Sequence, residues 1–177
     1  MRLARAILPL VRTTTTTAAS SPNAVLSVGD AVRERRHFTE ADVAAYAAVS
    51  GDRNPVHLDD AVARDVGGFQ RGRVVHGMLV ASVFPSVIAA HFPGAVYASQ
   101  TLRFAAPVYV GDEVVARVQA IHIRTMTTNG STSSRYAVKF ATKCFMDEDE
   151  GSLAIDGEAM AILPTLEWSL ETASKQQ

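Results

Sequence analysis

Apolar and polar residues alternate along the second half of the chain. In residues 136–143 the larger apolar side chains alternate with Lys139 and Lys143, which is typical of an antiparallel strand with one buried face. Similar patterns predict four strands, over residues 96–104, 113–125, 134–146 and 153–163. Turn residues separate these strands at 107–112, at Asn129-Gly130 and at 147–151.

A fully apolar stretch precedes the strands. Residues 77–90 are apolar on nearly every side of a helix, so they predict a buried helix. Its 14 residues fall short of the roughly 20 that a membrane span needs, so we expect it to pack on a curved sheet of the same protein. Pro85 cannot donate to the carbonyl of Ala81, and a kink or break is expected there. One buried helix followed by four strands indicates an α+β fold.

Smaller elements are expected ahead of the buried helix. A short strand is predicted within residues 26–36. A helix then begins at Thr39, which forms a capping box with Asp42, and ends at Gly51. A second, short helix is expected over about residues 59–65, capped by an aspartate.

The composition is that of one globular domain. The 177 residues are 47% apolar and 20% charged, and residues 25–165 contain no repeat or linker. The lone Cys144 excludes a disulfide within the chain and a cysteine-rich zinc cluster. The formal charge of −1 gives no reason to expect binding to nucleic acid or to a membrane surface.

The first 24 residues differ from the rest. They contain three arginines, many hydroxyl residues and no acid, which is typical of a mitochondrial transit peptide. A tail without a targeting role is the alternative, whereas the apolar run 6–11 is too short for a secretory signal. Removal of this segment leaves 14 basic and 18 acidic residues, a net charge near −4. Residues 166–177 are expected to form a C-terminal tail.

Asp52 and His57 form a candidate acid–base pair. They are separated by a turn that contains Pro55, and a turn can direct both side chains into one cavity. A carboxylate and an imidazole readily exchange protons near neutral pH. Taken alone, this spacing is also that of an ordinary surface pair.

A longer motif surrounds this pair. Residues 46–57, Tyr-Ala-Ala-Val-Ser-Gly-Asp-Arg-Asn-Pro-Val-His, and Ala63 beyond them closely resemble the signature of the MaoC-like R-specific enoyl-thioester hydratases and dehydratases. Val-His-Gly-Met at 75–78 and Phe-Ala-Ala-Pro-Val-Tyr-Val-Gly-Asp at 104–112 agree with that family. The resemblance covers about residues 26–164.

The resemblance implies a hot-dog fold, in which an antiparallel sheet wraps a central helix, and a homodimer. It implies reversible dehydration of R-3-hydroxyacyl thioesters, without a cofactor. Asp52 and His57 would bind the water and exchange its protons, Asn54 would orient the pair, and the N–H of Gly77 would hold the thioester oxygen. A free N–H at a helix start favours a negatively charged oxygen, which supports this role of Gly77.

Other residues near the motif allow two interpretations each. His76 either lines the pocket, or packs or caps the buried helix. Arg71 and Arg73 either dock an acidic acyl carrier or belong to a solvated loop. A metal site at Asp52, His57 and His76 is not expected, because no cysteine cluster or closely spaced histidine pair supports one.

Three alternatives remain for the function. A hot-dog thioesterase is disfavoured, because residues 77–91 contain no carboxylate. A non-catalytic acyl-thioester binder and an R-specific enoyl-CoA hydratase also remain. A stand-alone hot-dog domain with a presequence resembles the 3-hydroxyacyl-thioester dehydratases of mitochondrial type II fatty acid synthesis, which favours the matrix and leaves acyl carrier protein and coenzyme A both open as carriers.

Overall fold

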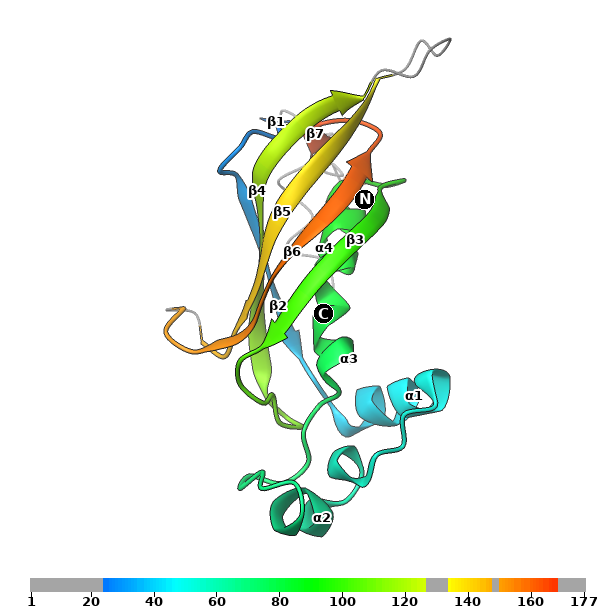
Figure 1. Ribbon diagram of the computed structural model, residues 1–177, viewed down its shortest axis with the longest axis vertical. Coiled ribbons are helices and arrows are strands. Elements are labelled where there is room, and N and C mark those ends of the chain that lie inside the picture. Colours follow the sequence, from blue (N-terminus) through cyan, green and yellow to red (C-terminus); the bar gives the residue numbers. More distant parts are fainter. Residues whose placement is uncertain (1–23, 127–133, 148–149, 169–177) are drawn as a thin grey trace, which may run out of the picture.

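The computed structural model describes residues 24–126, 134–147 and 150–168. Five antiparallel strands form one sheet in the order β2-β4-β5-β6-β3. Their bounds are Ala31–His37 (β2), Glu113–Met126 (β4), Arg135–Phe145 (β5), Leu153–Leu163 (β6) and Val96–Phe104 (β3). The sheet curves along a central helical segment (Figure 1), so the predicted α+β hot-dog arrangement is confirmed.

The buried helix consists of two segments, α3 (Gly77–Ala81) and α4 (Val83–His91). Ser82 separates them, and Pro85 lies in the first turn of α4. Backbone N–H groups in the first turn have no helical carbonyl to bond, so a proline there costs no hydrogen bond. The helix is therefore interrupted at Ser82. A kink or break was expected in this region because Pro85 cannot donate to the carbonyl of Ala81.

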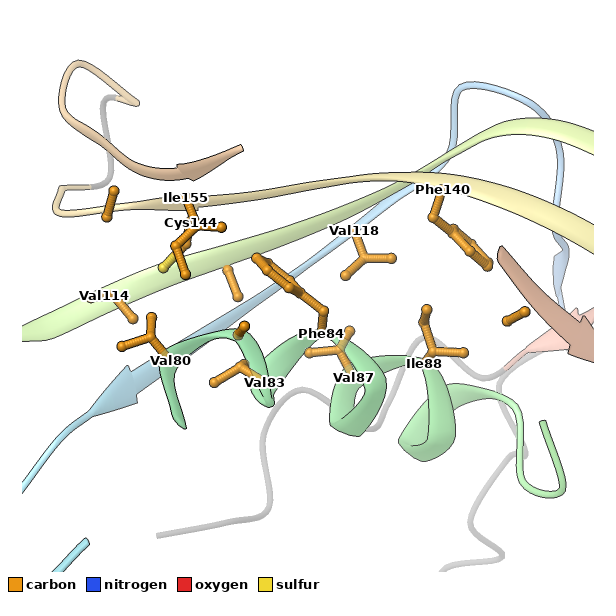
Figure 2. Close-up of a cluster of buried hydrophobic side chains, with 14 of the residues drawn as sticks. Val80, Val83, Phe84, Val87, Ile88, Val114, Val118, Phe140, Cys144 and Ile155 are labelled. Atoms are coloured by element: carbon orange, nitrogen blue, oxygen red, sulfur yellow. The ribbon is translucent and has the colours of Figure 1, made fainter. Parts of the chain in front are cut away.

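The core lies between this helix and the concave face of the sheet. Figure 2 shows Phe84, Val87 and Ile88 of α4 pointing toward the sheet, with Phe84 on the side of Cys144 and Ile88 on the side of Phe140. Phe84 and Val114 are fully buried. Each such side chain stabilises the fold by about 1.5–3 kcal/mol relative to an exposed one. The alternation predicted along the strands thus places one face in the core.

A lobe of short helices projects beyond one end of the sheet (Figure 1). It contains α1 (Glu40–Ser50), the 3₁₀ helix η1 (Pro55–His57) and α2 (Asp60–Asp65). The capping box of Thr39 and Asp42 is present, and Gly51 ends α1 with φ 78°. Both sequence signals are therefore confirmed.

The two ends of the described chain pair with each other. Strand β1 (Ala24–Val25) is antiparallel to β7 (Glu167–Trp168), and the side chain of Trp168 is buried. The packed domain therefore extends to Trp168, whereas the sequence placed a tail from residue 166. The strand expected within 26–36 begins only at Ala31, because Ser27 and Asp30 form a turn first.

Some predictions lie outside the described residues: the transit peptide up to residue 23 and the turn at Asn129-Gly130. Among the helices that the structure describes, none has the length and hydropathy required to cross a membrane.

Candidate active site

The loop between α1 and η1 is fixed by its own side chains. Asp52 Oδ1 accepts a hydrogen bond from the N–H of Asn54 at 3.1 Å, and Asn54 Oδ1 accepts one from the N–H of Val56 at 3.3 Å. Pro55 occupies the first position of η1, where its lack of an N–H has no cost. Asn54 therefore orients Asp52 through its backbone, while its side chain caps η1.

This loop brings Asp52 and His57 together. The distance between Asp52 Oδ2 and His57 Nε2 is 3.9 Å, and the side chain of His57 is only 13% exposed, against 50% for Asp52. His57 Nδ1 donates to the carbonyl of Val74 at 2.8 Å. Because a carbonyl only accepts, this bond assigns the proton to Nδ1 and leaves the lone pair of Nε2 on the side of Asp52.

Both groups line an apolar pocket. Its volume is about 450 Å³, and Gly77 at the start of α3 belongs to its wall. A Cβ on Gly77 would come within 2.7 Å of the ring of Phe104, so only glycine fits without a shift. The remaining lining is mostly apolar: Phe69, Val74, Val75, Met78, Val80, Ala105, Ala106, Pro107, Val108 and Ile155, with Tyr46. The pocket can hold an acyl chain beside the acid–base pair.

His76 does not belong to the pocket lining, and its side chain does not cap α3. It is 2% exposed, and its ring stacks on the ring of His57. The packed role foreseen for it is thus observed, whereas the capping and pocket-lining roles are not.

The carboxylate of Asp52 and the two imidazoles have ligand atoms within 4.8 Å of one another. However, the rings of His57 and His76 are stacked, with centroids 3.8 Å apart and planes inclined by 28°. Ring lone pairs lie in the ring plane, so two stacked rings do not point them at one ion. This set of residues therefore fits an acid–base site better than a metal site.

Arg71 and Arg73 both form ion pairs. Arg71 makes two hydrogen bonds to Asp112, at 2.6 and 3.0 Å, which raise its pKa, and its side chain is 58% exposed. Arg73 is 24% exposed and lies between Glu40 of α1 and Asp60 of α2; the hydrogen bond to Glu40 raises its pKa. Arg73 therefore links α1 to α2 through its ion pairs, and Arg71 is the more accessible of the two arginines.

Fold and site together define a hot-dog domain with a carboxylate and an imidazole, a candidate acid–base pair, at an apolar pocket. Residues 24–140 match the family described as MaoC like domain. The chain is 52% identical over 151 residues to the mitochondrial 3-hydroxyacyl-[acyl-carrier-protein] dehydratase of Arabidopsis thaliana, covering 85% of this chain and 86% of that protein. It is 40% identical over 141 residues to the (R)-specific enoyl-CoA hydratase of Aeromonas caviae, covering 78% and 96%.

Solved structures agree with these relatives. The (R)-hydratase of A. caviae involved in PHA biosynthesis superimposes with a TM-score of 0.66 at 38% identity, over 78% of this chain and 98% of that one. A Mycobacterium tuberculosis protein with a double hot-dog fold gives a TM-score of 0.67 at 20% identity, over 82% of this chain and 44% of that one, which concerns the fold alone. The chain belongs to the MaoC-like family, and the predicted family is confirmed.

Two features of the site carry no clear signal in the sequence. The carbonyl of Val74, which orients His57, comes from a backbone group 17 residues away. Phe104, which packs against Gly77, belongs to the end of β3. Much of the pocket wall does lie within the quoted motifs, since Tyr46, Val75, Met78 and residues 104–108 line it. What the sequence does not show is the contact between Phe104 and Gly77.

Proposed function

We propose that this protein dehydrates R-3-hydroxyacyl thioesters to trans-2-enoyl thioesters, and that it also catalyses the reverse hydration. The observation that carries the proposal is the position of Asp52 and His57, which face each other at the wall of an apolar pocket beside Gly77. The named relatives, which include dehydratases and a hydratase, support the same reaction class.

The reaction requires two proton transfers. A proton leaves C2, the carbon beside the thioester, and another joins the departing 3-hydroxyl, so that water and a C2–C3 double bond form. With 3.9 Å between Asp52 Oδ2 and His57 Nε2, a water oxygen can lie within hydrogen-bond distance of both, about 2.8 Å. The pair thus holds the water and exchanges its protons, with Nε2 as the initial base.

The thioester oxygen gains negative charge as the C2 proton leaves. The N–H of Gly77 lies in the first turn of α3, where no helical carbonyl accepts from it, and glycine lets the acyl group approach closely. Such a donor stabilises the developing oxyanion by about 3 kcal/mol.

Substitution of the pair tests this function. Asp52→Asn and His57→Ala should each lower kcat by at least about 10²-fold, because each removes half of the proton-transfer pair. Asp65→Asn and His122→Ala, which change an exposed acid and an exposed histidine elsewhere, are the matched controls. A folded Asp52 or His57 variant with half of the wild-type turnover would contradict the proposal.

The same assay separates the alternative functions. A thioesterase would release free thiol from a crotonyl thioester, whereas a hydratase yields the 3-hydroxyacyl product and a non-catalytic binder yields neither. The segment Gly77–His91 carries no carboxylate that could serve a thioesterase. We therefore expect hydration of the crotonyl substrate without thiol release.

For the cellular role, we propose 3-hydroxyacyl-acyl carrier protein dehydration in the type II fatty acid synthesis of the mitochondrial matrix, with R-specific hydration of enoyl-CoA as the alternative. Two relatives are named as mitochondrial acyl-carrier-protein dehydratases, and the first 24 residues are basic and free of acids. Sequencing the N-terminus of the organellar protein tests the presequence: a mature start near residues 20–30 is expected, and an intact Met1 would contradict it.

The carrier is proposed to dock beside the pocket through Arg71, and the protein is proposed to act as a homodimer. An acidic carrier meets a chain of negative net charge, so docking requires a local cation. Arg71→Glu should raise KM for the carrier-linked substrate more than for the coenzyme A substrate, and more at low salt. Arg73→Glu is the comparison variant. If KM rises equally for the carrier-linked substrate and the coenzyme A substrate, docking at these residues is rejected.

A further inference from the structure

Asp52 and His57 make no direct hydrogen bond with each other. Their nearest side-chain atoms are 3.9 Å apart, and Asp52 lies on a loop with half of its side chain exposed. A displacement of about 1 Å in such a pair can lower the rate by 10²-fold. The bond from the N–H of Asn54 to Asp52 and the bond from His57 Nδ1 to the carbonyl of Val74 each hold one member, so a group that contacts both is needed to fix the spacing at which both side chains reach one water.

His76 contacts both members of the pair. Its ring stacks on the ring of His57, with centroids 3.8 Å apart. Its Nε2 lies 3.1 Å from the backbone carbonyl of Asp52, and because the carbonyl only accepts, Nε2 carries the proton and donates. Tyr46 packs against the same ring, at 4.9 Å between centroids.

His76 is in turn anchored to the core. It directly precedes Gly77, the first residue of the buried helix, and is 2% exposed. Its Nδ1 is buried and has no hydrogen-bond partner in the described chain. Burial of a polar ring with one nitrogen unbonded is costly for a side chain that serves packing alone, since an apolar ring would fill the space without that cost.

We propose that His76 is a positioning residue of the site: it sets the distance between Asp52 and His57 by holding the carbonyl of one and the ring face of the other. This inference rests on the proposed dehydratase function. It assigns His76 no contact with the substrate, so its loss should act on turnover and not on substrate binding.

Two substitutions separate the contacts. His76→Phe keeps an aromatic face for His57 and removes the donor to the Asp52 carbonyl; His76→Gln keeps a donor near the position of Nε2 and removes the stacked ring. Each should lower kcat by about 10- to 100-fold and change KM less than about threefold. His91→Phe, a second histidine buried on the central helix but away from the pocket, is the matched control and should keep kcat.

The outcomes distinguish this inference from the proposed function. If Asp52→Asn loses activity while folded His76→Phe or His76→Gln keeps wild-type kcat and KM, the positioning role is wrong and the function stands. A rise in KM that matches the fall in kcat would assign His76 to substrate binding and also overturns the role. If Asp52→Asn and His57→Ala remain active, the function itself fails. Should His76→Phe not fold, the kinetics of His76→Gln decide.

Discussion

Gly77 shows at the scale of one residue how packing and chemistry restrict the same position. An added Cβ would lie 2.7 Å from Cε1 of Phe104, whose ring is 51% exposed and so has room to turn. The fold should therefore tolerate a methyl group at this position, whereas the pocket wall beside the thioester would shift.

We expect Gly77→Ala to lower kcat/KM by about 10- to 100-fold, because the proposed oxyanion donor and the acyl group would no longer lie at the right distance from each other. Thermal unfolding should change little. Combining it with Phe104→Leu should recover part of the activity, since the smaller side chain relieves the contact. Steady-state kinetics of the two single variants and the double variant measure this, and no recovery would show that the ring is not the obstacle.

Asp52 and His57 could be proposed as an acid–base pair from the sequence because they lie within the motif of residues 46–57, whereas their spacing alone is also that of an ordinary surface pair. The groups that orient the pair could not. The carbonyl of Val74 and the ring of His76 reach the site from 17 and 24 residues away, and only the tertiary fold brings them there. The position of a backbone carbonyl cannot be inferred from a pattern of side chains. A histidine in a buried segment gives the same sequence pattern whether its side chain packs in the core, caps a helix or orients a neighbouring residue.

At the scale of an element, α1 begins with a capping box that also depends on pH. The N–H and hydroxyl of Thr39 donate to the Asp42 carboxylate at 2.8 and 2.7 Å, and these bonds lower the pKa of Asp42 below its usual 3.8. A lowered pKa in the folded state means that the contribution to stability is present above pH 3.8 and is lost as the pH falls through the lower folded value.

Asp42→Ala should accordingly destabilise the protein by about 1 kcal/mol at neutral pH. The difference from wild type should shrink as the pH falls below about 3.8. Urea unfolding at a series of pH values measures the difference, with Asp65→Asn as a control for the loss of one exposed carboxylate. A difference that stays constant down to pH 2 would show that the carboxylate charge does not contribute.

Elements with a strong local signal were predicted well. The capping box and Gly51 fixed both ends of α1, and alternation located the four long strands. The two-residue strands β1 and β7 were missed, because pairing between residues 24–25 and 167–168 leaves no periodic pattern in so short a segment. Their pairing carries Trp168 into the core beside Phe92, which explains why the domain extends past its predicted end.

At the scale of the whole molecule, the two edges of the sheet differ in charge. The edge strand β2 contains three arginines and a glutamate in seven residues, whereas the nine residues of the opposite edge, β3, contain one charge, Arg103. Charged side chains on an edge strand disfavour its pairing with a strand of another chain, whereas an edge strand with few charges can pair in this way. The proposed homodimer should therefore form through β3, and its two-fold axis would bring identical residues of the two strands close together.

Placing lysines on β3 tests this arrangement. Ser99→Lys combined with Thr101→Lys introduces two cations on one face of the edge strand, and a two-fold axis would bring four of them together in a dimer. Light scattering should show the wild type at twice the chain mass and the double variant shifted toward one chain mass. Ala31→Lys, which adds a lysine to the charged edge strand β2, should leave the mass unchanged. If the wild type is a fully active monomer, or if the β3 variant remains a dimer while the β2 variant dissociates, the assignment of this edge is wrong.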